Sequence, residues 1–117
     1  MTIKPINDHT QNEVQMDGAE RVRMRMLIGP EQGARTFHMR HFEVQPGGHT
    51  PHHQHDHEHE VLILKGRGLV SSELGDRPIK PGDVVWVPPN EMHQFQNTGG
   101  EPLEFLCLIP APRESAR

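Results

Sequence analysis

Histidine is concentrated in one short stretch of this 117-residue chain. Six of the ten histidines fall within positions 49–59, and one more, His93, follows the Pro88-Pro89 pair. Imidazole is the commonest protein ligand for borderline transition metals, and two histidines separated by one residue on a strand project to the same side. His53 and His55 have this spacing. The pattern predicts a metal-binding site.

Short strands are the elements that must position these histidines. Eleven glycines and eleven prolines divide the chain into short pieces, several of which alternate apolar and polar residues. No amphipathic run of helical period and helix length follows residue 20. We expect about eight strands and an all-β fold, a small antiparallel β-barrel or jelly roll. The predicted strands cover residues 22–28, 36–44, 60–64, 69–73 and 84–87, the segment that begins at Phe95, and residues 103–109.

Turn signals separate these strands. Gly29-Pro30 ends the first strand, Pro46-Gly47-Gly48 forms a turn after the second, and Gly75-Asp76 is typical of a hairpin connection. Residues 1–19 show no period and are predicted to form an N-terminal arm. The barrel domain is then expected over residues 20–117.

Composition excludes several classes of function. The net charge of −4 and the pI near 6.2 disfavour a nucleic-acid partner. No run of residues is long and apolar enough for a membrane span, and the single cysteine, Cys107, suits a reducing, cytoplasmic location. With 32% hydrophobic residues and no tyrosine the core must be modest, so we expect a bound metal and a homodimer to add stability.

Two spaced motifs resemble those of the cupin family. The first runs from a glycine through His-x-His and a further ligand to a second glycine, here Gly47, His53, His55, His59 and Gly66. The second is represented here by Gly82, Pro88, Asn90, His93 and Asn97. Asn90 stands where the family has glycine, and asparagine tolerates the left-handed backbone that such a turn requires. A metal-scavenging loop without a fixed site is the alternative, but it leaves the spaced glycines and the distant His93 unexplained.

The identity of one ligand is open between His59 and Glu60, because the family usually has a glutamate here. If His59 points inward, Val61 and Ile63 point inward with it. If Glu60 points inward, Leu62 and Leu64 do so instead. Both sets are apolar, so the alternation alone leaves the two readings open. The motif spacing and the resemblance to small single-domain cupins favour His59.

The resemblance implies one divalent transition metal per chain, with manganese first and iron, nickel, copper or zinc as alternatives. The implied ligands are His53, His55, His59 and His93. Four protein ligands on an octahedral ion leave two positions for water, substrate or dioxygen, and neutral imidazoles preserve the full +2 charge of the ion. Most of the remaining histidines are expected at the surface; these are His9, His38, His41, His49, His52 and His57.

The resemblance also implies a small, mainly apolar substrate pocket. Its lining is expected to comprise Phe42, Thr50, Ile63, Phe95, Phe105, Cys107 and Ile109. Arg40 shares a strand face with Phe42, and burying that face is easier than burying the one that carries Glu43, so Arg40 is predicted to point inward. Arg40 and Cys107 are the candidate catalytic residues. The phenylalanines could equally be core residues, and Cys107 an inert buried thiol.

These features predict a metal-dependent oxygenase or oxidase that acts on a small apolar or aromatic molecule, with dioxygen as a second substrate. A redox-silent isomerase, lyase or hydrolase is the second hypothesis, and a non-catalytic ligand- or metal-binding protein is the third, because cupins host all of these. The opposite strand faces, which include Trp86 and the Leu106–Leu108 side, are expected at the homodimer interface.

Overall fold

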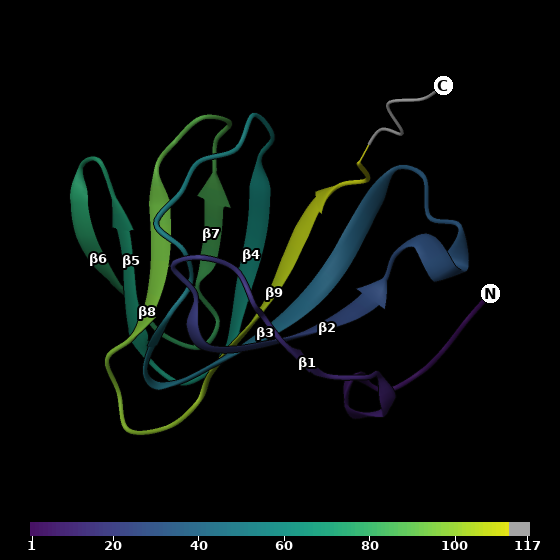
Figure 1. The fold of residues 1–117 in the computed structure, drawn as a ribbon, viewed down its shortest axis with the longest axis horizontal. Coiled ribbons are helices and arrows are strands. Elements are labelled where there is room, and N and C mark those ends of the chain that lie inside the picture. Colours follow the sequence, from purple (N-terminus) through teal and green to yellow (C-terminus); the bar gives the residue numbers. More distant parts are fainter. Residues whose placement is uncertain (113–117) are drawn as a thin grey trace.

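A single curled antiparallel sheet forms the computed structural model, which describes residues 1–112 (Figure 1). Within that range nine strands and two 3-10 helices, η1 (Ile6–Asp8) and η2 (Pro30–Gln32), are present and no α-helix. The strands are β1 (Asn12–Glu13), β2 (Glu20–Ile28), β3 (Phe37–His49), β4 (His59–Lys65), β5 (Gly68–Ser72), β6 (Gly75–Ile79), β7 (Val84–Val87), β8 (His93–Asn97) and β9 (Leu103–Pro110). The predicted all-β jelly-roll class is confirmed.

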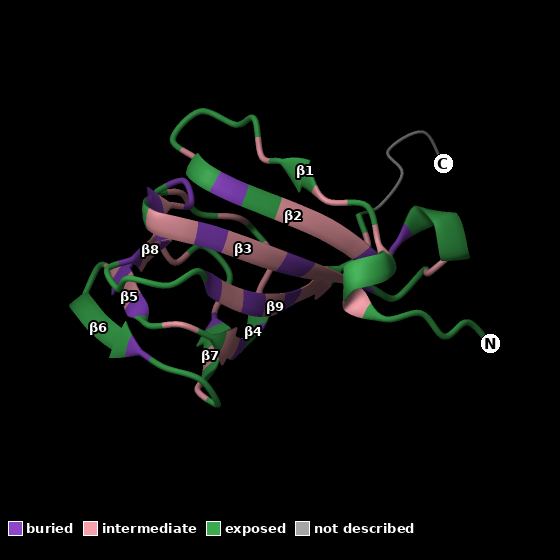
Figure 2. Ribbon diagram, turned by 90° about the horizontal axis from the view of Figure 1, so that it is seen from below, coloured by how far each residue is buried: buried purple, intermediate pink, exposed green. Residues whose placement is uncertain are grey.

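Strand β3 holds the two halves of the sheet together. The strand order is β6-β5-β8-β3-β9-β4-β7. Strand β2 pairs with β3 along the edge opposite β9, and β1 pairs with β2. The first part of β3 lies between β2 and β9, whereas its last residue, His49, pairs with Gln96 of β8. The sheet therefore curls, and the β8 half turns toward the β4 half (Figure 2).

Two turn predictions were wrong. Residues 46–48 continue β3 instead of ending it, through an irregularity in the β2–β3 register at which Gly47 has a φ of 82°. A side chain at Gly48 would stand 2.5 Å from the carbonyl oxygen of Glu20, so glycine permits the close approach of the two strands. The second hairpin turns at residues 73–74, and Gly75 begins β6.

Alternating residues of the long strands form the core on the inner face of the sheet. The buried cluster comprises Val22, Val44, Val61, Ile63, Ile79, Phe95, Leu103, Phe105 and Cys107. Asn97 ties the strands together, because its Nδ2 donates to the carbonyl oxygens of Val44 at 2.8 Å and Glu101 at 2.7 Å. The alternation predicted for β8 and β9 therefore matches the side chains that are buried. In β2 the alternation breaks at a register irregularity between Met26 and Ile28, so that Leu27 is buried and Ile28 is 40% exposed.

Two histidines expected at the surface are buried. His38 is 5% exposed and His41 is 1% exposed. His41 lies on a central strand between Arg25 of β2 and Leu106 of β9, and its Nε2 contacts the carboxylate of Glu104 at 3.0 Å. This polar partner explains why a histidine is accepted at a buried position.

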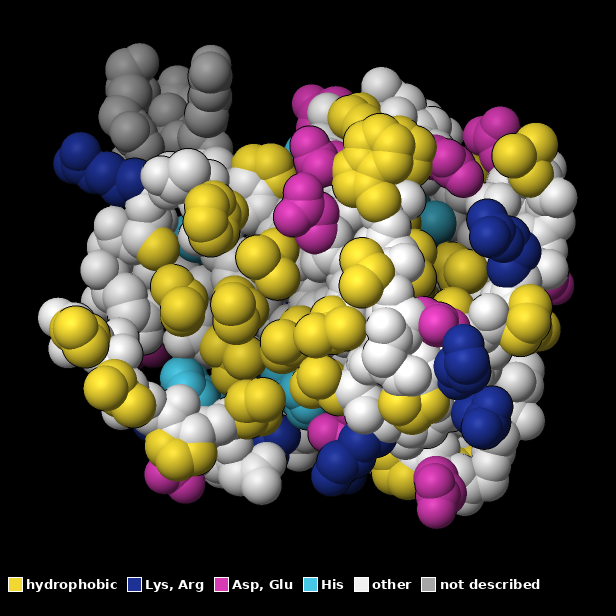
Figure 3. All heavy atoms as spheres, turned by 180° about the vertical axis from the view of Figure 1, so that it is seen from behind, with side chains coloured by type: hydrophobic (Ala, Val, Ile, Leu, Met, Phe, Trp, Pro, Cys, Tyr) yellow, Lys and Arg dark blue, Asp and Glu magenta, His cyan; other side chains and the backbone are white. Residues whose placement is uncertain are grey.

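The outer face carries large apolar side chains in solvent, visible together on the side of the molecule seen in Figure 3. Val84 is 76% exposed, Trp86 60% and Leu62 38%. No helix among residues 1–112 has the length and apolar character to cross a membrane. The division into an arm (1–19) and a domain (20–117) stays a prediction; within the arm, β1 pairs with β2, and residues 113–117 lie outside the described range.

Candidate metal centre

The four histidines of the predicted metal site lie together. The ring of His53 has its centroid 4.4 Å from that of His55 and 4.9 Å from that of His93. His59 is 4.8 Å from His93 and 5.3 Å from His55, measured in the same way. Residues separated by up to forty positions in the chain (53 to 93) are thus brought into one cluster.

The backbone explains how the cluster forms. His59 begins β4 and His93 begins β8, so each ring is attached to a regular strand. His53 and His55 were predicted on a strand, but they lie in a loop that is fixed at two points. His53 exchanges two backbone hydrogen bonds with His93, at 2.9 and 3.1 Å, and the amide of Asn90 donates to the carbonyl oxygen of His55 at 2.6 Å. Asn90 has a φ of 67°, the left-handed conformation expected at this motif position.

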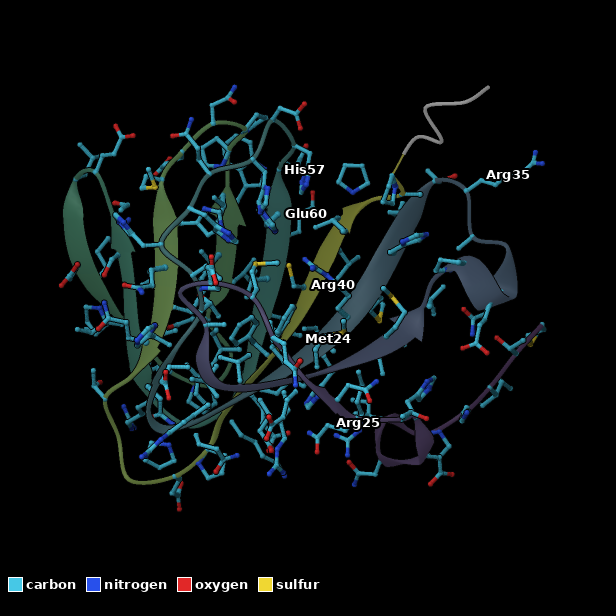
Figure 4. The ribbon with its side chains drawn as sticks, in the orientation of Figure 1. Met24, Arg25, Arg35, Arg40, His57 and Glu60 are labelled. Carbon is cyan, nitrogen blue, oxygen red and sulfur yellow. The ribbon has the colours of Figure 1, made fainter. Side chains whose placement is uncertain are left out.

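The structure separates the two candidate ligands on β4. His59 is 6% exposed and faces the cluster, whereas the next residue, Glu60, is exposed on the opposite side of the strand (Figure 4). Val61 and Ile63 are buried with His59, at 2% and 1% exposure. The ring of His59 therefore reaches the other imidazoles and the carboxylate of Glu60 does not; the role of His59 as a metal ligand stays a prediction.

Two ring nitrogens of the cluster have no hydrogen-bond partner in the protein and are free to accept a ligand. The Nε2 atom of His59 is buried and has no hydrogen-bond partner, while its Nδ1 lies 3.4 Å from the Sγ of Cys107. His93 donates from Nδ1 to the carbonyl oxygen of Glu91 at 2.9 Å, which leaves a lone pair on its Nε2. In the present side-chain positions no three donors of residues 1–112 already form a complete metal-binding group, so a bound ion requires the rings to turn toward one another.

Burial keeps the imidazoles neutral. It is the largest cause of a lowered pKa at His59, to about 3, and at His53, to about 4. The pKa values of His55 and His93 are also lowered, again mainly by burial. Neighbouring histidines and Arg40 add to the shift at His53, His55 and His59 because they disfavour a further positive charge. At neutral pH the cluster therefore presents uncharged nitrogen donors.

Arg40 and Cys107 lie beside this cluster. Arg40 donates from Nη2 to the Sγ of Cys107 at 3.2 Å, and its Cζ stands 4.9 Å from the ring centroid of Phe42. Its Nε is buried and has no partner. Burial raises the pKa of the Cys107 thiol, and the adjacent guanidinium opposes that shift, so the thiol is protonated at neutral pH. Arg40, Cys107 and His59 form a chain of polar contacts that ends at the histidine cluster.

Most of the predicted pocket residues are packed into the core. Those that are buried are Thr50 (8% exposed), Phe95 (4%), Phe105 (2%) and Ile63 (1%). The hydroxyl of Thr50 accepts a hydrogen bond from the amide of Phe95 at 2.9 Å, which is a structural role. Phe42 is half-buried and stacks on Phe105 at 5.3 Å, and Ile109 lies at the margin of the core, where it lines a shallow groove on the other side of the sheet.

Sequence reasoning missed three neighbours of the site. Met24 and Met26 of β2 pair with Phe42 and Arg40 and are half-buried on the same face. Met24 and Arg40 are labelled in Figure 4. Their alternation with the arginines of β2 is a signal for the inner face, but pairing with β3 was needed to place them beside the site. The third neighbour, His57, contacts both His55 and His59 through its ring.

Comparisons with known proteins agree with the fold. The family model described as Cupin domain matches residues 40–109. A 1-methylthio-D-xylulose 5-phosphate methylsulfurylase of Rhodospirillum rubrum is 42% identical over 79 residues, which are 68% of this chain and 51% of that protein. The chain thus spans about half the length of the curated relatives that it matches first.

Solved structures resemble the chain over most of its length. The polyketide cyclase RemF of Streptomyces resistomycificus superposes with a TM-score of 0.91 at 32% identity, covering 97% of this chain and 81% of that one. A predicted oxalate decarboxylase of Thermotoga maritima gives a TM-score of 0.84 at 30% identity and covers 95% of this chain and all of that one.

Proposed function

Because the chain belongs to the cupin family, we propose that it is an enzyme that depends on one divalent transition metal per chain. Manganese is the first candidate, before iron, nickel, copper and zinc. The proposed ligands are His53, His55, His59 and His93. The observation that supports this most strongly is the buried, unpartnered Nε2 of His59 within a cluster of neutral imidazoles. A buried nitrogen of this kind is unfavourable unless a ligand satisfies it.

The proposed substrate is a small, mainly apolar or aromatic molecule that carries an anionic oxygen. Arg40 supplies the positive charge for that oxygen, since its buried Nε has no partner in the protein. Phe42, Met24 and Met26 are half-buried and offer an apolar surface beside the guanidinium. The role of Arg40 is to bind and orient, because an arginine remains protonated throughout the physiological pH range.

We propose an oxygenase or oxidase reaction at this site. A bound divalent ion would supply Lewis acidity and, if redox-active, electron transfer. No Asp or Glu is buried among residues 1–112. Cys107 is held by Arg40 and His59 and is proposed to orient the imidazole of His59. A single thiol also accords with the proposed cytoplasmic location.

A redox-silent reaction is the second candidate, and the extent of the likeness to a polyketide cyclase favours it. Curated relatives include glucose-6-phosphate isomerases, which match about half of this chain and a third of their own length. In this case Arg40 would hold an enolate or carboxylate oxygen of the substrate. The apolar contacts of Phe42 and the methionines would be the same.

The dependence of turnover on oxygen distinguishes the two candidate reactions. Protein reconstituted with Mn²⁺ or with Zn²⁺ is incubated with small aromatic carboxylates and phenols, in air and under argon. Oxygen uptake coupled to substrate loss in the Mn²⁺ protein supports the oxygenase. Equal turnover under argon and with Zn²⁺ supports the redox-silent reaction, and saturable binding without turnover contradicts an enzymatic role. Arg40→Met, which keeps the apolar length of the side chain, is the control for recognition of the anion.

A further inference from the structure

Five imidazoles, rather than four, make up the histidine cluster. The ring of His57 lies parallel to that of His55, with centroids 4.9 Å apart and an interplanar angle of 5°, and it is 5.0 Å from His59. The remaining edges are His53–His55 at 4.4 Å, His53–His93 at 4.9 Å and His59–His93 at 4.8 Å. The five rings thus form a closed circuit, and His55 also lies 5.3 Å from His59 and 6.2 Å from His93 across it.

The five rings differ in how far they are buried. His59 and His93 are 6% and 4% exposed, whereas His53, His55 and His57 are half-buried. His57 lies in the loop that precedes β4, and its Nδ1 lies 3.3 Å from the carbonyl oxygen of Glu58. A ring nitrogen that faces a carbonyl oxygen carries the proton. The Nε2 atom of His57 therefore keeps its lone pair and can bind a metal ion.

We propose that His57 is an entry ligand that captures a divalent ion together with His55 at the rim of the cluster. A metal–nitrogen bond is about 2 Å long, so adjacent rings at these separations can bind one ion in common once a ring turns. His55 and His57 are nearly parallel, so the half-buried ring of His57 has to turn its Nε2 toward the ion before the two can share it. His57 would then speed the uptake of metal without belonging to the final ligand set. This inference rests on the metal centre proposed above.

The test is the rate of metal uptake. Metal-free protein is mixed with Co²⁺ in a stopped-flow instrument, and the visible absorption of the bound ion is followed to its plateau. We expect His57→Ala and His57→Gln to slow uptake by about tenfold and to leave the final stoichiometry and spectrum unchanged. His52→Ala is the matched control, because His52 is an exposed histidine of the same segment, and it should leave the rate unchanged.

The outcomes separate this inference from the metal centre itself. Equal rates in the His57 variants and the wild type would overturn the entry role and leave the proposed centre intact. Loss of a full equivalent of Co²⁺ in His57→Gln would also overturn it, because His57 would then be a permanent ligand. Absence of uptake by the wild type would overturn both proposals.

Discussion

Acid should destabilise the metal-free protein through His59. The pKa of His59 falls from 6.5 to about 3 on folding, mainly because of burial. Between these two values the unfolded chain binds a proton that the native state does not. The stabilising contribution is therefore complete above pH 6.5 and is lost progressively as the pH falls toward the native pKa. One such group changes the free energy of unfolding by about 1.4 kcal/mol per pH unit, or ~3 kcal/mol over two units. His59 is only 6% exposed, so solvent screening reduces this value little.

Urea unfolding of metal-free protein at several pH values between about 4.5 and 7.5 measures the effect. His59→Gln removes the titrating group, so the free energy of unfolding should depend less steeply on pH in the variant, by about 1.4 kcal/mol per unit below pH 6.5. His52→Gln, at an exposed position, should keep the wild-type slope. Parallel curves for wild type and His59→Gln would refute the claim that His59 is buried as a neutral imidazole.

Three further predictions follow from the site and its scaffold. His59→Ala should empty the metal centre whereas Glu60→Ala should not, as metal analysis after dialysis will show; the reverse would assign the ligand to Glu60. Arg40→Met should weaken binding of an aromatic carboxylate by about tenfold or more and leave its neutral amide unaffected, as measured by calorimetry; equal loss for both would contradict an anion anchor. Asn97→Ala should lower the free energy of unfolding by about 3 kcal/mol, because the hydrogen bonds from its Nδ2 to the carbonyl oxygens of Val44 and Glu101 are lost. Urea unfolding measures this change, and a loss below about 1 kcal/mol would contradict the structural role of Asn97.

Alternation and motif spacing were sufficient to predict the fold class and the inner faces of β4, β8 and β9, but not the end of β2, where Leu27 is buried in place of Ile28. Once His59 points inward, the period of two in β4 determines that Val61 and Ile63 follow it and that Glu60 does not. The same rule predicted the inward direction of Arg40. These features depend only on local backbone geometry, so the sequence alone carries them.

Other features depend on contacts between distant strands. The run 46–48 has the composition of a turn, yet β3 continues through it because Glu20 of β2 approaches Gly48 closely. His41 was expected in solvent, but its burial depends on Glu104, a partner 63 positions away. The position of His57 in the imidazole circuit depends on the path of a loop without regular structure. No local pattern encodes such pairings.

The most direct test of the proposed metal centre is elemental analysis of untagged protein that has been purified without a nickel column. We expect about one equivalent of a divalent transition metal per chain in the wild type. We also expect His93→Ala to lose that metal and to have a lower melting temperature. Less than a tenth of an equivalent of any such metal, with no uptake on reconstitution, would contradict the metal centre.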